Sequence, residues 1–270
     1  MSNIQIACQT YTWEMLGDEW RGKVTDILDW VSAAGYAGIE ITNNMIREFG
    51  DRPGDFAAEL EARGMQLAAF NYSSPTGFTD PARRDDDLAN GLRWVEFLKH
   101  FPQAKMGLSG AANPDRTDAR QKLDLAVGLY NDIGKAAAAA GLSANVHPHS
   151  HYGSLLESAE EYQYLLDNLD PKCVSFGPDT GHIIRGGQDL LTCLRTYLPR
   201  LTHLHFKDVD AHRTWQPLGQ GVVDFPAVMS LLEEGGYDGW VVGEEESAEA
   251  RENGVAAINH NRQYLRSIGY

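Results

Sequence analysis

GLSANVHPHS, residues 141–150, is the stretch that points most clearly to the fold. Its residues 143–146 form a short apolar run typical of a buried strand, and the run leads directly into His147, Pro148 and His149. Side chains two residues apart in a strand face the same way, so the two imidazoles share one side. Pro148 has no backbone donor and ends strand pairing there. Histidines held at the end of a buried strand are suited to metal ligation or proton transfer.

Apolar runs of the same kind recur along the chain, and helical patterns separate them. The predicted strands cover residues 4–8, 38–41, 66–70, 104–108, 143–146, 173–176, 201–206 and 240–242. The predicted helices cover residues 23–34, 55–63, 88–100, 120–140, 158–167, 189–197, 225–234 and 248–267. Strict alternation is typical of a parallel sheet covered by helices. Eight units in 270 residues favour a single (β/α)8 TIM barrel over residues 1–270, an α/β fold, rather than an open doubly wound sheet.

Composition restricts the classes of partner. A hydrophobic content of 43% and a charged content of 23% are typical of a soluble globular protein. The net charge of −15 disfavours nucleic acid and anionic membranes, which bind basic surfaces. It is compatible with divalent cations and neutral substrates. Cys8, Cys173 and Cys193 form no CxxC pair and indicate reduced thiols. With no signal peptide and no membrane-spanning run, we expect a cytoplasmic protein.

The barrel hypothesis predicts that functional side chains directly follow the strands, because barrel enzymes carry their sites at the carboxyl ends of the strands. Polar and aromatic residues do gather there, whereas the strand beginnings show no comparable cluster. These residues are Thr10, Tyr11, Trp13, Thr42, Asn43, Asn44, Asn71, Tyr72, His147, His149, Asp179, His182, His205, Lys207, Asp208, Glu244 and Glu246.

Four of these residues suggest a metal site. His147, Asp179, His205 and Glu244 end the fifth to eighth predicted strands, which converge in a barrel. Mixed nitrogen and oxygen ligands suit Mn²⁺, Co²⁺, Fe²⁺ or Zn²⁺ better than Ca²⁺. Each residue alone has an ordinary explanation: a histidine at the rim, an aspartate that caps a helix, a glutamate in a solvated acidic run. The recurrence in four consecutive units favours one divalent metal ion.

Strand parity and charge suggest roles for the neighbours of these residues. His203 shares a face with His205 one layer deeper, so we expect it to support the ligand by a hydrogen bond. Glu246 shares a face with Glu244, whereas Glu245 points away from it. Lys207 is expected to neutralise an oxyanion, or to act as an acid if burial lowers its pKa. Alternatively, Lys207 pairs with Asp208 at the rim.

The motifs at the strand ends resemble those of the xylose-isomerase-like TIM barrels. They are HPH at 147–149, DTGH at 179–182, THLHFKD at 202–208, PLGQGVVDF at 217–225 and YDGWVVGE at 237–244. GYAGIE at 35–40 is similar to the second-strand motif of that superfamily. The superfamily includes keto-sugar epimerases, hydroxypyruvate isomerase, inosose dehydratase and endonuclease IV. Its nuclease needs a basic DNA-binding face, which this acidic chain lacks.

The resemblance implies one divalent ion, often Mn²⁺, held on strands five to eight. Asp179, His205 and Glu244 match three of the ligand positions. In the epimerases the fifth-strand ligand is a glutamate that is also one of two opposed bases, and this chain has His147 there. A His-Pro-His at this strand looks like the inosose dehydratase branch. A homo-oligomer, or a partner chain, is compatible with the sequence.

Two enzyme hypotheses share a first step. The leading one is an isomerase or epimerase that acts on a keto-sugar or cyclitol through an enediolate, which the metal stabilises. Glu244 or a histidine removes a proton, and His149, His182 or Lys207 returns one. The alternative is an inosose dehydratase-like or 3-keto-glycoside lyase that eliminates a β-substituent from the same intermediate. A non-catalytic sugar-binding barrel is the alternative from another functional class.

The predicted substrate-binding residues are Trp13, Tyr72 and Trp215 as apolar walls and Asn43, Asn71 and Arg213 as hydroxyl binders.

Overall fold

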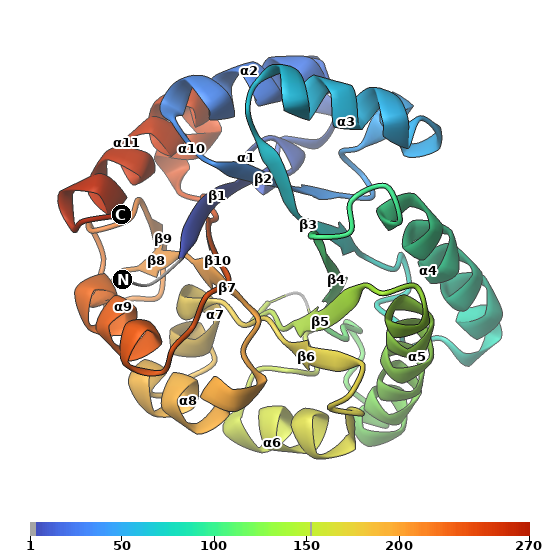
Figure 1. Ribbon diagram of the computed structural model, residues 1–270. Helices are drawn as coiled ribbons and strands as arrows, with labels where there is room; N and C mark the ends of the chain where they lie inside the picture. Colours follow the sequence, from blue (N-terminus) through green and yellow to red (C-terminus); the bar gives the residue numbers. More distant parts are fainter. Residues whose placement is uncertain (1–3, 152) are drawn as a thin grey trace.

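Eight parallel strands form the wall of a barrel in the computed structural model, which describes residues 4–151 and 153–270 (Figure 1). The strands are β1 (Gln5–Gln9), β2 (Gly38–Thr42), β3 (Gln66–Tyr72), β4 (Lys105–Ser109), β5 (Ser143–His147), β6 (Val174–Phe176), β7 (His203–Phe206) and β10 (Trp240–Gly243). Their order in the sheet is β6-β5-β4-β3-β2-β1-β10-β7. The (β/α)8 barrel predicted from the sequence is confirmed.

The barrel is nearly closed, and its looser seam lies between β6 and β7. Two isolated parallel bridges join these strands, Phe176 with Leu201 and Asp179 with His205. The backbone N–H of His205 donates to the carbonyl of Pro178 at 2.9 Å. The seam therefore places two of the predicted metal ligands next to each other.

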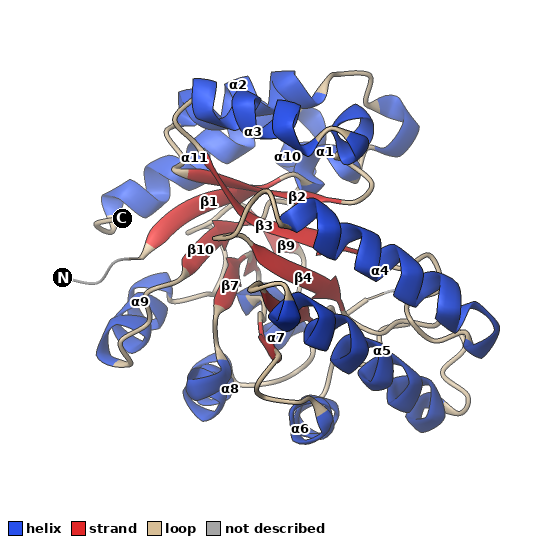
Figure 2. Ribbon diagram, turned by 45° about the vertical axis from the view of Figure 1, so that its right-hand side comes forward, coloured by secondary structure: helices blue, strands red, loops and turns tan. Residues whose placement is uncertain are grey.

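Helices surround the sheet on its outer side (Figure 2). The longer ones are α2 (Val24–Ala34), α3 (Pro53–Ala62), α4 (Arg84–Leu98), α5 (Ala119–Ala139), α6 (Ala159–Asn168), α8 (Leu190–Tyr197), α9 (Phe225–Glu234) and α11 (Gly254–Ser267). The short ones are α1 (Tyr11–Glu14), α7 (Thr180–Arg185), α10 (Ala248–Glu252) and the 3₁₀ turns η1 (Gly17–Glu19), η2 (Arg47–Asp51), η3 (Pro81–Arg83) and η4 (Leu198–Arg200). Among the described residues, no helix has the length and apolar character needed to cross a membrane.

Three details differ from the sequence prediction. The helix expected over 248–267 is two helices, because the Asn253 side chain accepts a hydrogen bond from the N–H of Ala256 and starts α11. The short helices α1 and α7 show no helical period because they have only four and six residues, and α7 was anticipated only through Asp179, which caps it. A two-stranded hairpin of β8 (Asp208–Val209) and β9 (Trp215–Gln216) follows β7 and was also missed.

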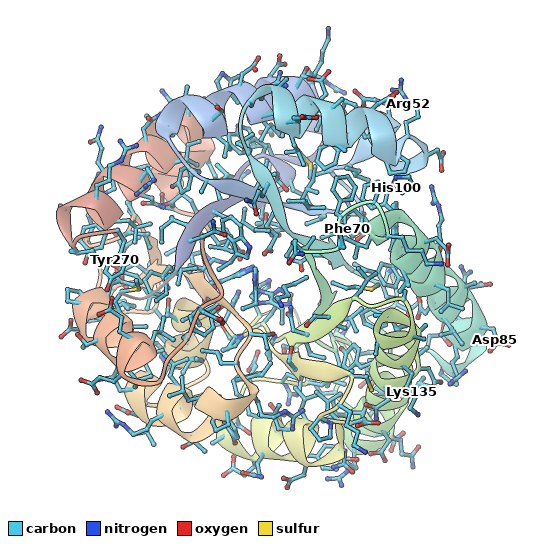
Figure 3. The ribbon with its side chains drawn as sticks, viewed as in Figure 1. Arg52, Phe70, Asp85, His100, Lys135 and Tyr270 are labelled. Atoms are coloured by element: carbon cyan, nitrogen blue, oxygen red, sulfur yellow. The ribbon has the colours of Figure 1, made fainter. Side chains whose placement is uncertain are left out.

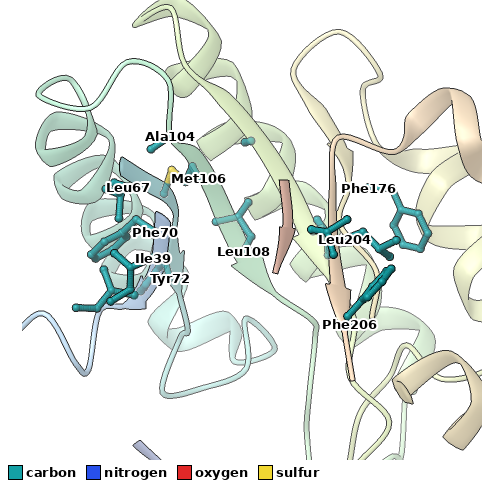
Figure 4. Packing of buried hydrophobic residues seen from close by; sticks show 14 of the residues in the cluster. Ile39, Leu67, Phe70, Tyr72, Ala104, Met106, Leu108, Phe176, Leu204 and Phe206 are labelled. Atoms are coloured by element: carbon teal, nitrogen blue, oxygen red, sulfur yellow. The ribbon is translucent and has the colours of Figure 1, made fainter. Parts of the chain in front are cut away.

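The apolar core lies between the sheet and the helices. In β7, Leu204 and Phe206 point into this layer (Figure 4), and the Phe206 ring lies 4.8 Å from that of Phe225 in α9. Alternation within the strand leaves His203 and His205 for the barrel interior. Figure 3 shows the same division on a larger scale, with charged side chains such as Arg52 and Asp85 at the periphery. Burial of the outward-facing strand residues thus fixes which polar side chains enter the barrel.

Candidate active site

A polar cavity of about 270 Å³ opens at the carboxyl ends of the strands. Its side chains come from both halves of the barrel and are mostly hydroxyls, amides, carboxylates and imidazoles. Among the described residues, no lysine or arginine lines it. A second cavity, of about 460 Å³, lies between α3 and the segment before β4, but it is largely apolar, and Glu61 is its one ionisable residue in the described chain. The cavity at the strand ends is the one that the predicted functional residues His147, His149 and Glu244 line.

The four predicted metal ligands come together beside this cavity. His147, Asp179, His205 and Glu244 are all buried, and one ligand atom from each lies within 4.8 Å of the others. Each residue sits at or just after the end of a strand, so the convergence of the strands produces the cluster. Two imidazole nitrogens and two carboxylate oxygens form a donor set that suits Mn²⁺, Co²⁺, Fe²⁺ or Zn²⁺.

Two of the four residues show that the cluster fits a cation. Asp179 Oδ1 accepts the N–H of His182 at 2.8 Å, but Oδ2 has no hydrogen-bond partner within the described chain. Burial raises the pKa of Asp179 to about 6, because the charged carboxylate is poorly compensated. His147 Nδ1 lies 2.8 Å from the Gly177 carbonyl, which can only accept, so this nitrogen carries the proton. The other ring nitrogen of His147, Nε2, therefore carries a lone pair and lies 3.9 Å from Glu244 Oε2. Both of these atoms can serve as ligands of one cation.

Glu40 of β2 supports the cluster from below. Its carboxylate lies 3.0 Å from His205 Nε2 and also accepts hydrogen bonds from His203 Nε2 and the Asn71 amide. Burial disfavours the imidazolium of His205, but Glu40 and Glu244 outweigh it and raise the His205 pKa to about 10. A carboxylate on the far nitrogen of a ligating imidazole is typical of metal sites, because it orients the ring and increases its basicity. The predicted supporting role of His203 is thus shared with Glu40.

Lys207 is buried among carboxylates. Its Nζ donates to Glu244 Oε1 at 2.7 Å and to Glu246, and it lies 4.5 Å from the ring centre of Trp215. Burial alone would lower the Lys207 pKa, but the negative charges of Glu244, Glu246 and Asp179 raise it above its ordinary value. The condition under which Lys207 was expected to act as an acid, a pKa lowered by burial, is therefore not met.

The alternative partner of Lys207, Asp208, is engaged elsewhere. Its two carboxylate oxygens accept four backbone N–H groups, from Val209, Gly219, Gly221 and Val223, at 2.9–3.1 Å. Asp208 therefore organises the loop after β9 and is no rim partner for Lys207.

The predicted proton-transfer histidines differ in access. His149 lines the cavity, and no side chain of the described residues hydrogen-bonds to its ring. Burial, together with the nearby His147 and His151, holds the His149 pKa well below its ordinary value, so the ring is neutral. His182 is fully buried and lies outside the lining, and its Nδ1 accepts the backbone N–H of Ser150 at 3.0 Å. His149 therefore remains a candidate for contact with substrate, whereas His182 supports the strand end.

A family model of xylose isomerase-like TIM barrels matches residues 28–268. The chain belongs to this family. An inosose dehydratase of Geobacillus thermodenitrificans is 33% identical over 267 residues, which cover 87% of this chain and 86% of the relative. An inosose dehydratase of Lacticaseibacillus casei is 27% identical, with 88% and 87% covered. These family members extend over nearly the same length as this chain.

Solved structures of sugar epimerases share the fold at low sequence identity. The D-psicose 3-epimerase of Clostridium cellulolyticum superposes with a TM-score of 0.79 at 17% identity, with 98% of each chain covered. The 3-keto-D-glucoside 4-epimerase of E. coli gives a TM-score of 0.75 at 18% identity, again with 98% of each chain covered. At such identities the likeness concerns the fold, and the chemistry has to be argued from the residues.

One of the predicted substrate-binding residues reaches the cavity, namely Asn71. Trp13 is instead in the core, 3% exposed, and stacks on Trp30 with ring centres 5.7 Å apart. Tyr72 is also buried, and its hydroxyl donates to the carbonyl of Asp87. The apolar walls expected from Trp13 and Tyr72 are therefore absent from this cavity, because both rings pack between sheet and helices.

The remaining predicted binders make contacts with other parts of the chain. Asn43 is held by the backbone of Ser73, whose N–H donates to Asn43 Oδ1 at 2.7 Å. Arg213 is exposed and donates to the carbonyl of Arg185 at 3.0 Å, with a left-handed φ of 66° in the turn of the β8–β9 hairpin. Trp215 covers Lys207. None of the three lines the cavity in the described part of the chain.

Several lining residues were not singled out from the sequence. They are Gln9, Glu14, Ser73, Ser74 and Ser109, all from the segments that follow β1, β3 and β4 or end those strands. Their types are common at protein surfaces, so composition offers no signal for them. Only their positions, at or just after the ends of predicted strands, could have marked them as lining residues. Glu14 lies one helical turn beyond Thr10, which was among the strand-end residues.

Proposed function

We propose that this chain is a metal-dependent dehydratase that removes water from a keto-cyclitol of the inosose type. The curated relatives that carry the name inosose dehydratase are 27–33% identical over about seven-eighths of the chain. The observation that carries the proposal is His147, whose Nε2 faces Glu244 Oε2 at 3.9 Å. The family resemblance implies that the epimerases have a glutamate at the position of His147. Epimerisation between two opposed carboxylates would lose one partner here, so elimination replaces isomerisation as the leading hypothesis.

His147, Asp179, His205 and Glu244 would hold the cation, because their donor atoms converge and Asp179 Oδ2 lacks another partner among the described residues. Bound there, a divalent cation supplies Lewis-acid polarisation of a substrate carbonyl, which makes the neighbouring C–H more acidic. Mn²⁺ is our first choice, and Co²⁺, Fe²⁺ and Zn²⁺ suit the same donors.

The chain itself would move the protons. His149 is neutral and lines the cavity, so its ring nitrogen can accept the proton from the carbon next to the carbonyl. Burial and the neighbouring Glu244 raise the pKa of Glu246 to about 7, so this carboxyl is partly protonated near neutral pH and can protonate the departing hydroxyl. One C–H and one C–O bond break, a C=C bond forms, and a proton and hydroxide leave as water.

Mass spectrometry of the reaction separates the two hypotheses. The Mn²⁺-loaded protein is incubated with an inosose, and the product mass is followed over time. Loss of one water supports the dehydratase proposal, whereas a new isomer of unchanged mass supports the isomerase. The Asp179→Asn variant serves as the control for background elimination, which is appreciable for β-hydroxy ketones.

We also propose a cytoplasmic location. The three cysteines, Cys8, Cys173 and Cys193, are all free thiols, as in reducing compartments. Labelling of the thiols in intact cells and in lysate tests this, because oxidation in intact cells would contradict it.

A further inference from the structure

We propose that Glu14 binds ring hydroxyls of the substrate and restricts the cavity to uncharged polyols. The inference rests on the proposed function, since it names the class of cyclitol that the same site accepts. Glu14 belongs to α1, directly after β1, and β1 lies four strands from β5 in the ring of eight. Its carboxylate therefore faces the cavity from the side of the barrel opposite His147 and His149.

A directed chain of hydrogen bonds presents donors to one oxygen of Glu14. The backbone N–H of Ser73 can only donate, and it donates to Asn43 Oδ1 at 2.7 Å. This fixes the Asn43 amide, whose Nδ2 donates to Asn44 Oδ1 at 3.1 Å. Asn44 is thereby fixed in turn, and its Nδ2 donates to Glu14 Oε1 at 2.7 Å. Asn43 is thus a positioning residue for this carboxylate and no direct binder of substrate.

The second carboxylate oxygen of Glu14 also accepts a hydrogen bond. The hydroxyl oxygen of Thr42 accepts the N–H of Met45 at 3.2 Å, so its own proton is free to point elsewhere. That proton is directed to Glu14 Oε2, with the two oxygens 2.5 Å apart. Both carboxylate oxygens therefore act as acceptors, and each keeps a second lone pair for another donor. A vicinal pair of ring hydroxyls is a donor of matching geometry.

Glu14 also lacks a cationic partner. No lysine or arginine in the part of the chain that the structure describes forms an ion pair with it, and burial raises its pKa. An uncompensated carboxylate at a cavity wall costs folding free energy, which is characteristic of functional sites rather than of packing. Hydrogen bonds from substrate hydroxyls to a carboxylate are strong because the acceptor is charged.

The same charge excludes anionic ligands. Besides Glu14, the cavity presents the carboxylates of Glu244 and Glu246, which are both paired with the buried Lys207. A phosphate or carboxylate on the substrate would meet Glu14, which forms no ion pair with a lysine or arginine of the described chain, and none of these residues lines the cavity there. Uncharged cyclitols and keto-cyclitols satisfy the site, whereas sugar phosphates and cyclic keto acids do not.

Binding of an unreactive polyol tests the role of Glu14 without relying on turnover. Calorimetry measures myo-inositol binding to the Mn²⁺-loaded native protein and to Glu14→Gln. We expect myo-inositol to bind about 10-fold to 100-fold more weakly to the variant, the range for a hydrogen bond to a charged group. For an inosose, KM should rise by a similar factor while kcat changes far less. Glu19→Gln, on the exposed turn η1, is the matched control and should leave both unchanged.

Quinate, a ring polyol with a carboxylate, tests the charge filter. The native protein should bind it more weakly than myo-inositol, and Glu14→Gln should narrow that difference. Equal myo-inositol binding by native protein and variant, with unchanged KM, would overturn the proposal. Polyol binding that depends on Glu14 without any water loss from an inosose would refute the dehydratase and leave the role of Glu14 standing. Water loss from an inosose with the same KM in the native protein and in Glu14→Gln would support the dehydratase and refute the role of Glu14.

Discussion

The two halves of the barrel mouth differ in how their side chains are held. On β5, β6, β7 and β10, ionised groups contact one another directly, as in the ion pair of Lys207 with Glu244 at 2.7 Å. On β1 to β4, neutral amides and hydroxyls form a directed chain that ends at Glu14. The first half concentrates charge for chemistry, and the second arranges acceptors for recognition. Most groups for chemistry and most groups for recognition therefore come from different strands, although β2 contributes to both, through Glu40 beneath the metal cluster and Thr42 beside Glu14.

The largest effect that we expect comes from His149 in the reactive half. His149→Gln removes the titratable ring and should lower kcat for water loss by roughly 10²–10⁴-fold, the usual contribution of a general base. Mn²⁺ affinity and polyol binding should stay near those of the native protein, because His149 is outside both the ligand cluster and the Glu14 chain. Single-turnover kinetics measures the effect. His100→Gln, on the outer surface after α4 (Figure 3), is the control, and near-native kcat for His149→Gln would contradict the assignment.

Asp179→Asn separates metal binding from folding. The variant loses one of the two charged ligands, so Mn²⁺ binding should weaken by about 10²–10³-fold, which corresponds to about 3–4 kcal/mol. The fold should persist, because an asparagine oxygen can still accept the N–H of His182 that starts α7. Calorimetric titration with Mn²⁺ measures the affinity.

Asp189→Asn is the matched control for that variant, since Asp189 caps α8 by the same contact with Thr192. It should retain full Mn²⁺ affinity. Retained metal in Asp179→Asn would show that the ligand set is different.

Glu40→Gln tests the support beneath the reactive half. Loss of the carboxylate on His205 Nε2 should weaken Mn²⁺ binding by about 10–100-fold, the usual effect of removing such a partner. Glu245→Gln is the control, because Glu245 is a buried carboxylate next to Glu244 in sequence that accepts from Asn261 of α11 instead. Equal Mn²⁺ affinity in both variants would mean that Glu40 serves packing alone.

The smallest effect concerns stability in acid. Burial and the nearby Lys207 lower the pKa of His151 to about 4, so the folded protein binds fewer protons than the unfolded chain below pH 6.5. The neutral ring makes its full contribution to the free energy of unfolding above pH 6.5, and this contribution is lost as the pH falls towards 4. From pH 7 to 5 the part of the loss that His151 contributes should be about 2 kcal/mol at 1.36 kcal/mol per pH unit.

Urea unfolding at the two pH values measures this loss. His151→Asn should lose about 2 kcal/mol less than the native protein over the same interval. His212→Asn, on the exposed turn after β8, should follow the native curve. If the free energy of unfolding of His151→Asn depends on pH as it does in the native protein, another group of the site causes the loss of stability in acid.

Much of the reactive half was predictable from the sequence. His147, Asp179, His205 and Glu244 are residue types with few roles at the end of a buried strand, and parity correctly separated Glu245 from Glu244. The sign of the Lys207 pKa was not predictable, because it depends on carboxylates from β6 and β10. Trp13 was misassigned for a related reason, since an aromatic residue after a strand suits either a cavity wall or the core.

The barrel and the candidate ligands could be predicted from the residue pattern alone. Eight short apolar runs that alternate with helical patterns favour a closed parallel sheet covered by helices, in which the strand ends converge. Which groups share protons and charge became clear only in the folded chain. Glu40 and His203 are 163 positions apart, and Glu14 and Asn44 are 30 apart, so no local pattern links them. Hydrogen-bond direction and pKa arise from such distant contacts, which exist only once the chain has folded.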